Sequence, residues 1–309
     1  MTATLVRALF AGPLDIVGDV HGEIDALRAL LRHLGYSAAG IHPEGRRLVF
    51  VGDLVDRGPD IPAVVELVRR FVESERAQCV LGNHELNLLL GMRKPDNVWF
   101  FQHPQQTMLD FFAVLPLALE RPDVRVVHAC WDDDAIEAAR QGTQAVELHR
   151  EYQVRIAEDV RRRGLSESCA KLAHQNDDPV KLLTSGPETT ADEPFVSMGK
   201  LRHERRVAWW HEYTGPLCVF GHYWRIQLPN EVDGDRLFID VPFNAALGRG
   251  AAMCVDYSVG KRFLERAASD FAGVYRSRLA ALRLPERVLM FDDGSALPID
   301  NPFPPRMMP

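Results

Sequence analysis

The chain has 309 residues, of which 46% are hydrophobic and 26% are charged, and its formal net charge is −7. This composition excludes a disordered chain, a collagen-like fibre and a disulfide-rich miniprotein. The acidic balance disfavours a dedicated nucleic-acid-binding protein, because such proteins usually carry a basic excess. No apolar run approaches the roughly 18 residues of a membrane span, and the first residues carry only fragments of a secretory signal. We therefore expect a cytoplasmic protein with no membrane partner. Four of its five cysteines lie in short apolar runs, and we expect buried thiols in a reducing compartment.

Short apolar runs alternate with helical patterns along much of the chain. The runs are rich in Val, Ile, Leu and Phe without clean alternation, which is typical of strands buried on both faces. Predicted strands cover residues 13–19, 47–53, 77–83, 124–129, 216–222, 236–241 and 251–257. Apolar residues three or four positions apart predict helices over 24–34, 64–72 and 108–115. This alternation predicts a layered α/β architecture.

Residues 131–215 depart from the alternating pattern. They begin with an acidic run, continue as long helical patterns and then pass through a stretch rich in Pro, Gly, Thr and acidic residues. We expect a helical insertion with an irregular loop, inside a single domain that spans residues 1–309. After residue 257 we expect one or two hairpins, a helix near 270–283 and a short strand at 288–291.

Metal-competent residues follow several of the predicted strands. Three runs end in Gly18-Asp19-Val20-His21-Gly22, in Gly52-Asp53-Leu54-Val55-Asp56-Arg57-Gly58 and in Gly82-Asn83-His84-Glu85, and two more end in His128 and His222. Because functional groups of α/β sheets gather at the carboxyl ends of strands, we expect these side chains to meet. Carboxylate, imidazole and amide oxygen ligands suit Mn, Fe or Zn. Six such ligands are too many for one tetrahedral zinc and suit two ions about 3.5–4 Å apart.

The motifs GDVHG, GDLVDRG and GNHE, followed by two single histidines, resemble those of the calcineurin-like metallophosphoesterase superfamily. They span residues 18–222 in the family's order, and the final GHYW is similar to the phosphoprotein phosphatase group. The stretches GNHELNLLLG and FGHYW also resemble the bacterial diadenosine tetraphosphatase branch, which usually lacks the Asp-Arg-Gly found here at 56–58. The resemblance implies a two-layer mixed β-sandwich flanked by helices, the α/β/β/α metallophosphoesterase fold, with the helical insertion over the metal centre.

The resemblance also divides the six ligands between two divalent ions. One ion would be held by Asp19, His21 and bridging Asp53, and the other by Asp53, Asn83, His128 and His222. Manganese is the first expectation for both ions, and iron, zinc or cobalt are compatible with the same ligands.

Further roles follow from the same resemblance. Arg57 would bind phosphate oxygens, and its planar fork suits that task. His84 would protonate the leaving group and would be oriented by Asp56; a histidine titrates close to neutral pH, as a general acid should. The family usually has a second phosphate-binding arginine before the last histidine, and Arg206 or Arg202 could fill that role.

The expected activity is hydrolysis of phosphate esters or anhydrides by in-line attack of a metal-bridging hydroxide, without a covalent phosphoenzyme. The first expectation is a Ser/Thr-type phosphoprotein phosphatase, and the alternative is a dinucleoside polyphosphate hydrolase acting on diadenosine tetraphosphate. A nuclease is disfavoured by the acidic net charge and by the absence of GHxH. An inactive binding module is disfavoured because all the expected metal ligands and the general acid are present. Trp209 and Trp210 could stack on a nucleobase, but we expect them in the core.

Overall fold

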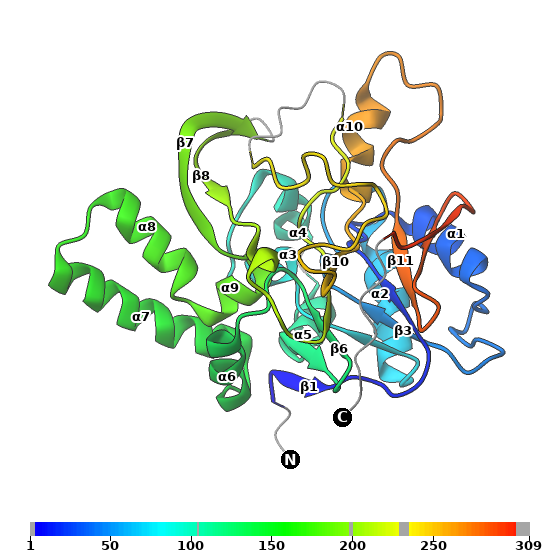
Figure 1. Ribbon diagram of the computed structural model, residues 1–309, viewed down its shortest axis with the longest axis horizontal. Helices are drawn as coiled ribbons and strands as arrows, with labels where there is room; N and C mark the ends of the chain where they lie inside the picture. The colour runs from blue at the N-terminus through cyan, green and yellow to red at the C-terminus, as the bar shows by residue number, and fades with distance from the viewer. Residues whose placement is uncertain (1–3, 104, 198–199, 229–234, 301–309) are drawn as a thin grey trace.

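The computed structural model describes residues 4–103, 105–197, 200–228 and 235–300. Two mixed β-sheets form the centre of the molecule, and helices surround them (Figure 1). One sheet has the order β1 (Val6–Ala8), β5 (Ala118–Glu120), β6 (Val124–Val127), β9 (Leu217–Phe220) and β10 (Ala252–Cys254). The other has the order β13 (Ala296–Pro298), β12 (Val288–Phe291), β11 (Ala280–Leu284), β2 (Leu14–Val17), β3 (Arg47–Phe50) and β4 (Ala77–Cys79). The predicted two-layer mixed sandwich is confirmed.

Each sheet contains three neighbouring parallel strands. They are β2, β3 and β4 in the six-stranded sheet, and β6, β9 and β10 in the five-stranded sheet. The remaining partners are antiparallel, apart from β1, which runs parallel to β5. Because parallel neighbours end at the same edge, each sheet presents three carboxyl ends side by side.

Alternate strand residues face two different apolar environments. Ile16 and Val49, which are register partners, belong with Val126 and Val219 to one buried cluster drawn from both sheets. The intervening Val17 and its neighbours on β3 pack instead with the residues of the flanking helices. This two-sided burial explains why the strands read as continuous apolar runs.

The three predicted helices are present in the first half of the chain. They are α1 (Ile24–Leu34), α2 (Ile61–Glu73) and α5 (Gln106–Ala113), and the structure adds α3 (Asn83–Leu89), η1 (Pro95–Asn97) and α4 (Val98–Gln102). α1 ends at Gly35, whose φ of 92° is readily adopted only by glycine. α2 begins at Asp60, whose side chain accepts a hydrogen bond from the Ala63 backbone N–H.

The chain between β6 and β9 forms four helices and a hairpin, which extend to the left in Figure 1. The elements are α6 (Asp133–Gln141), α7 (Ala145–Arg163), α8 (Glu167–Asn176), α9 (Pro179–Ser185), β7 (Glu188–Ser197), β8 (Lys200–Arg206) and η2 (Trp209–His211). The prediction of an irregular loop in this segment is wrong, because α9 and β7 occupy that stretch. Asp178 accepts hydrogen bonds from the Val180 and Lys181 N–H groups and so begins α9.

Two further expectations for the last third of the chain are wrong. Residues 237–240 form turns rather than a strand, and Arg236 and Asp240 have positive φ angles that end an extended run. Residues 270–283 form no helix: after η3 (Val259–Lys261) and α10 (Arg262–Ala267), the chain reaches β11 at Ala280. Pairing of β11 with both β2 and β12 overrides the helical propensity of its Ala and Leu residues. Among the described residues, none of the helices has the length and apolar character needed to cross a membrane.

Candidate metal centre

The six predicted metal ligands converge at the carboxyl edges of the two sheets. Asp19 and His21 follow β2, Asp53 follows β3 and Asn83 follows β4, while His128 follows β6 and His222 follows β9. Five of them are among the buried polar residues of the protein: Asp19, His21, Asp53, His128 and His222. The two sheets therefore contribute to one site between their ends.

The carboxylate of Asp53 lies at the middle of this group. Its Oδ2 is 3.6 Å from His21 Nε2, and its Oδ1 is 3.4 Å from His128 Nε2. Because the two oxygens face different histidines, Asp53 has the geometry of a ligand shared by two ions.

Asn83 connects the histidines of the second expected metal position. Its Oδ1 is 3.1 Å from His128 Nε2 and 3.0 Å from His222 Nδ1. On the other side, Asp19 Oδ2 is 4.0 Å from His21 Nε2, and the Asp19 carboxylate accepts the His222 backbone N–H. These distances place the donor atoms close enough to coordinate common ions.

Backbone carbonyls orient two of the imidazoles. His21 Nδ1 lies 2.9 Å from the Val55 carbonyl, and His128 Nδ1 lies 2.7 Å from the Val51 carbonyl. A carbonyl can only accept, so each Nδ1 carries a proton and each Nε2 is the atom that faces the centre. This is the usual arrangement around a metal-ligating histidine.

The loops that carry the site have an unfavourable backbone conformation at several residues that are not glycine. The φ angles are positive at His21 (46°), Asp53 (49°), Asp56 (70°), Arg57 (71°) and His222 (64°). Such positions cost about 1–3 kcal/mol each and persist only where the surroundings enforce them. Their concentration at one place is a second indication, independent of the ligand types, that this edge carries the function.

Glu85 enforces part of this loop geometry. Its buried carboxylate accepts the backbone N–H groups of Asp53 (2.9 Å), Leu54 (2.8 Å) and Gly82 (3.1 Å). Burial raises the pKa of Glu85 to about 7, with the Asp53 charge acting in the same direction. The motif GNHE contains this residue, but the sequence alone did not indicate that it holds the Asp53 loop.

The electrostatics of the site match divalent cations. Burial and the neighbouring Asp256 carboxylate hold the pKa of Asp19 well above its usual range. Burial opposes protonation of His128, but Asp53 outweighs it and raises the His128 pKa to about 10. Asp256 Oδ2 is buried and has no hydrogen-bond partner among the residues that the structure describes. Clustered buried carboxylates of this kind are costly without a compensating positive charge, so the donor set fits metal ions.

A hydrogen-bonded chain orients the expected general acid. His84 Nδ1 lies 2.5 Å from Asp56 Oδ2, and the indole N–H of Trp99 donates to Asp56 Oδ1 at 2.8 Å. Burial lowers the pKa of His84, but the Asp53 and Asp56 carboxylates outweigh it, so the net shift is upward. Trp99 was missed by sequence reasoning, since nothing in its local pattern distinguishes it from a core residue.

Both arginines expected to bind phosphate border the site. Arg57 Nη1 is 2.9 Å from His21 Nε2 and its Nη2 is 3.1 Å from His84 Nε2, while Arg206 Nη1 donates to the His222 carbonyl at 3.3 Å. The Trp224 ring lies 5.0 Å from the Arg57 guanidinium and 5.6 Å from that of Arg206. The tryptophan of GHYW therefore lies between the two arginines and packs against both.

The expectation that Trp209 and Trp210 are core residues is confirmed. Trp210 is 1% exposed and stacks on Phe220 and Phe238, and Trp209 packs on Phe220 at 4.9 Å. Neither ring is open to a nucleobase.

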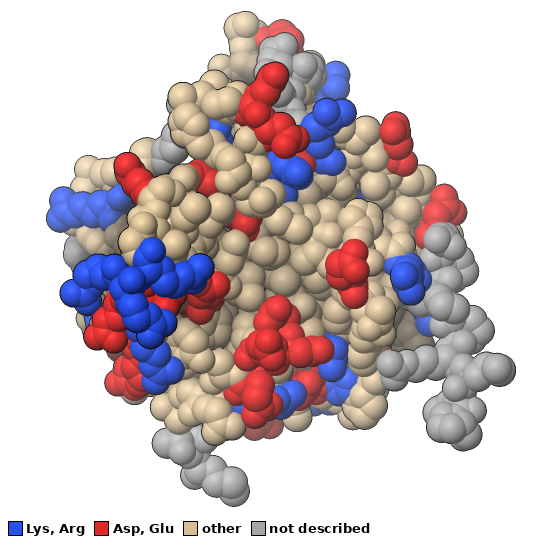
Figure 2. Space-filling view, turned by 60° about the vertical axis from the view of Figure 1, so that its left-hand side comes forward, with Lys and Arg blue, Asp and Glu red and all other residues tan. Residues whose placement is uncertain are grey.

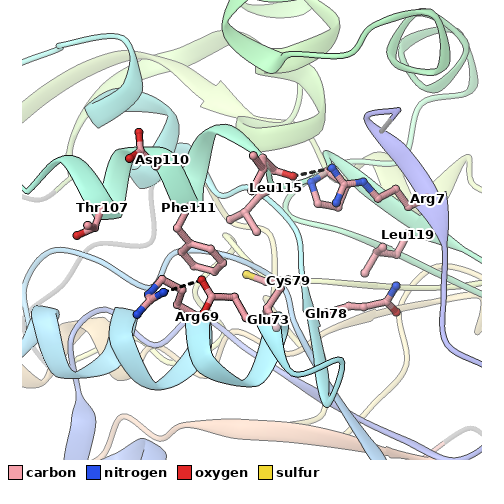
Figure 3. Close-up of a pocket in the computed structure, with 13 residues that line it drawn as sticks. Arg7, Arg69, Glu73, Gln78, Cys79, Thr107, Asp110, Phe111, Leu115 and Leu119 are labelled. Carbon is pink, nitrogen blue, oxygen red and sulfur yellow. Dashed lines mark hydrogen bonds and ion pairs between the residues drawn. The ribbon is translucent and has the colours of Figure 1, made fainter. Parts of the chain in front are cut away.

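A separate cavity of about 350 Å³ lies between α2, α5 and β1 (Figure 3). Arg69 forms an ion pair with Glu73 at its wall, and Arg7 donates to the Val114 carbonyl at 2.6 Å. Burial raises the pKa of Cys79, which also lines it, so this thiol is no nucleophile at neutral pH. None of the predicted site residues borders this cavity.

A sequence model of the calcineurin-like phosphoesterase family matches residues 12–224. The chain belongs to this family. The match extends from the start of β2 to Trp224, and so contains all six predicted ligands together with Asp56, Arg57, His84 and Arg206.

Named relatives cover part of the chain. An asymmetrical bis(5'-nucleosyl)-tetraphosphatase PrpE of Geobacillus sp. is 42% identical over 106 residues, which are 33% of this chain and 42% of the relative. A symmetrical bis(5'-nucleosyl)-tetraphosphatase of Janthinobacterium sp. is 37% identical over 122 residues, which are 37% of this chain and 42% of the relative. The chain thus spans less than half the length of these relatives.

The structure of a cold-active protein-tyrosine phosphatase of a Shewanella species is similar to this one over a larger part of the chain. The structural match covers 95% of this chain and 82% of the phosphatase, with a TM-score of 0.54 and 15% sequence identity. At this identity the likeness concerns the fold alone.

Proposed function

We propose that this chain is a dinuclear-metal phosphoesterase. The observation that carries the proposal is the convergence of six ligands, with Asp53 between two groups of them, beside Arg57 and His84. When bound, two divalent ions would lower the pKa of a water and neutralise phosphoryl oxygens. Manganese is proposed first because the ligands are oxygen and imidazole, and iron, zinc or cobalt suit the same set.

The side chains around the centre have distinct tasks in this proposal. Arg57 and Arg206 bind the non-bridging oxygens of the scissile phosphate, and their charge matches that of the transition state. As the bond between phosphorus and the leaving oxygen breaks, His84 gives its Nε2 proton to that oxygen. Asp56 holds the imidazole in position through Nδ1. A water molecule forms the new bond to phosphorus in line, on the side opposite the leaving group, and gives up a proton. Because the attacking oxygen belongs to water and not to a side chain, no phosphoenzyme forms.

Two substrate classes are supported by different observations. The named relatives act on dinucleoside tetraphosphates, which favours a phosphoanhydride substrate. The complete Asp56-Arg57-Gly58 motif resembles the phosphoprotein phosphatases, which favours a phosphoserine or phosphothreonine ester.

The test is a comparison of kcat/KM on diadenosine tetraphosphate and on a phosphothreonine peptide, both with Mn²⁺. Preference for one substrate by about a hundredfold, or about 2.7 kcal/mol, assigns the class. The Asp53→Asn variant must lose both activities. Activity that survives in this variant contradicts the metal mechanism.

The insertion at 131–215 is proposed to shape the entrance to the metal centre within a single domain. The hairpin supports this, because Ser197, Arg202 and Arg206 border the same cavity as Asp53 and His84. A cytoplasmic location is proposed on the five free cysteines, of which only Cys169 is exposed. The face shown in Figure 2 mixes acidic and basic side chains with broad uncharged areas, which supports a small substrate rather than a nucleic acid.

A further inference from the structure

A cleft leads outward from the metal centre between α3, the helices α8 and α9, and the β7–β8 hairpin. Its volume is about 340 Å³, and Asn83 and His222 form its inner end. A second cavity of about 430 Å³ lies directly over the metal centre and is bordered by Asp53, Arg57 and His84. The two spaces share several residues at their junction: Asn83, Asn87, Lys94, Ser197, Arg202, Arg206 and His222. They therefore form one continuous depression.

Positively charged side chains line the cleft from the metal centre to its outer end. They are Arg206, Arg202, Lys94, Lys181 and Lys171, against three acidic residues, Glu188, Glu204 and Asp235. These cations come from β8, from the loop after α3, and from α8 and α9. The surplus is local, because the whole chain has a net charge of −7. A cleft with a surplus of one charge sign attracts and holds ligands of the other.

The cations of the cleft are only partly neutralised by the protein. Lys171 forms an ion pair with Glu204, and Arg206 Nε lies 4.0 Å from Asp235. Lys181 and Arg202 form no ion pair with any residue in the described part of the chain. Lys181 is held at the start of α9 by the Asp178 cap, so its backbone position is well defined.

The place of His84 indicates which part of a substrate the cleft can hold. His84 borders the cavity over the metal centre and does not border the cleft. The leaving group must lie beside this acid, so the cleft lies away from the leaving group. A phosphomonoester has only one bridging oxygen, which is that of the leaving group, and nothing of it extends into the cleft. An internal phosphate of a polyphosphate chain has a second bridging oxygen, which continues into further phosphates.

We propose that the cleft is a binding site for the phosphate chain that continues from the scissile phosphate on the side away from the leaving group. The ligand class is a nucleoside polyphosphate, in which each successive phosphate carries negative charge that a row of Lys and Arg side chains matches. The inference rests on the proposed phosphoesterase function and narrows its substrate to an anhydride attacked within the chain.

The outer lysines offer a test that leaves the metal centre intact. Lys171→Met and Lys181→Met together remove two charges from the cleft and keep most of each apolar stem. The matched control is Arg155→Met with Arg162→Met on α7, where both side chains are exposed and do not line the cleft. The double cleft variant should lower the ratio of kcat/KM for diadenosine tetraphosphate to that for p-nitrophenyl phosphate about tenfold, at roughly threefold for each charge.

An unchanged ratio in the cleft variant, or an equal change in the control, overturns the proposal. A doubly phosphorylated peptide is the third substrate. If its kcat/KM falls as much as that of the tetraphosphate, the cleft binds anionic peptide and the assignment to polyphosphate is wrong.

A binding measurement separates this inference from the proposed function. The ligand is a methylene-bridged triphosphate, which resists hydrolysis, titrated into the full chain with Mn²⁺ in a calorimeter. The cleft variant should bind it about tenfold more weakly than the wild type and the control. If the wild type hydrolyses no substrate, the proposed function fails, and this titration still decides whether the cleft binds a phosphate chain. Equal affinity in the wild type, the cleft variant and the control variant overturns the inference that the cleft binds a phosphate chain.

Discussion

The strand-end loops and the segment between β6 and β9 differ in how they are built. The loops are buried and hold positive φ angles at His21, Asp53 and His222. The other segment is a layer of helices and a hairpin whose residues Val196 and Leu201 are more than half exposed. A strained, buried loop can place ligand atoms to a fraction of an ångström, whereas an exposed hairpin is free to vary. This difference supports the proposal that the loops hold the catalytic groups and that the helical segment shapes the entrance for substrate.

The largest effect on activity is expected when Asp53, the proposed shared ligand, is replaced. Asp53→Asn takes away the negative charge between His21 and His128 and should abolish metal binding and hydrolysis. Metal content after dialysis against Mn²⁺, together with kcat, measures both effects. Asp25→Asn, at an exposed position of α1, is the control and should retain metal and activity. A metal-loaded Asp53→Asn protein would contradict the assignment of the centre.

The next largest effect is expected at the general acid. His84→Asn should retain the metal ions and lose about 10²–10⁴ in kcat, because the leaving oxygen then departs without a proton. The loss should shrink for p-nitrophenyl phosphate, whose leaving group is stable as an anion. His203→Asn, at an exposed position of β8, should change neither value. Equal losses on good and poor leaving groups would rule out a proton-donating role for His84.

Metal affinity should depend on pH through His128. Asp53 helps raise the pKa of this imidazole to about 10 in the metal-free protein, whereas it is about 6.5 in the unfolded chain. The bound proton therefore stabilises the metal-free fold fully below pH 6.5, and this contribution is lost as the pH rises through 10. Metal must displace this proton, so affinity should rise about tenfold per pH unit between pH 7 and 9.

Calorimetry in buffers of different ionisation enthalpy measures the protons released when metal binds. One proton should be released at pH 8 in the wild type, and His128→Asn should release fewer. An affinity that does not change between pH 7 and 9 would contradict the raised pKa of His128 in the metal-free protein.

The convergence of the six candidate ligands was predictable because each lies shortly after a buried strand. Asp53 comes shortly after the apolar run Leu48–Val51, and His128 directly follows Val126 and Val127. Parallel pairing of β2 with β3, and of β6 with β9, then brings neighbouring strand ends together. The segments whose secondary structure was predicted wrongly depend on the strands that pair with them. β11 has a composition that suits a helix, and only its position between β2 and β12 makes it a strand. In the same way, β7 is a strand because Thr189 and Thr190 pair with Arg205 and Glu204 across the hairpin.

The smallest effect on kcat is expected at Trp99, a residue whose role could not be predicted from the sequence. Its indole N–H reaches Asp56 across 43 residues of chain and completes the hydrogen bonds that hold the carboxylate against His84. Trp99→Phe keeps an aromatic side chain and removes this hydrogen bond, which is worth about 1 kcal/mol. We expect kcat to fall about fivefold on a phosphothreonine or nucleotide substrate, with little change in KM.

Trp131 is a matched control for this variant. Its indole N–H also donates to a carboxylate, that of Asp133, at 2.9 Å and outside the metal centre. Trp131→Phe should therefore cost similar stability without lowering kcat. The two variants are compared on substrates of increasing leaving-group basicity. Because Trp99 acts on the proton donor, its effect should grow with that basicity, and an effect of constant size would mean that it only supports the fold around α4.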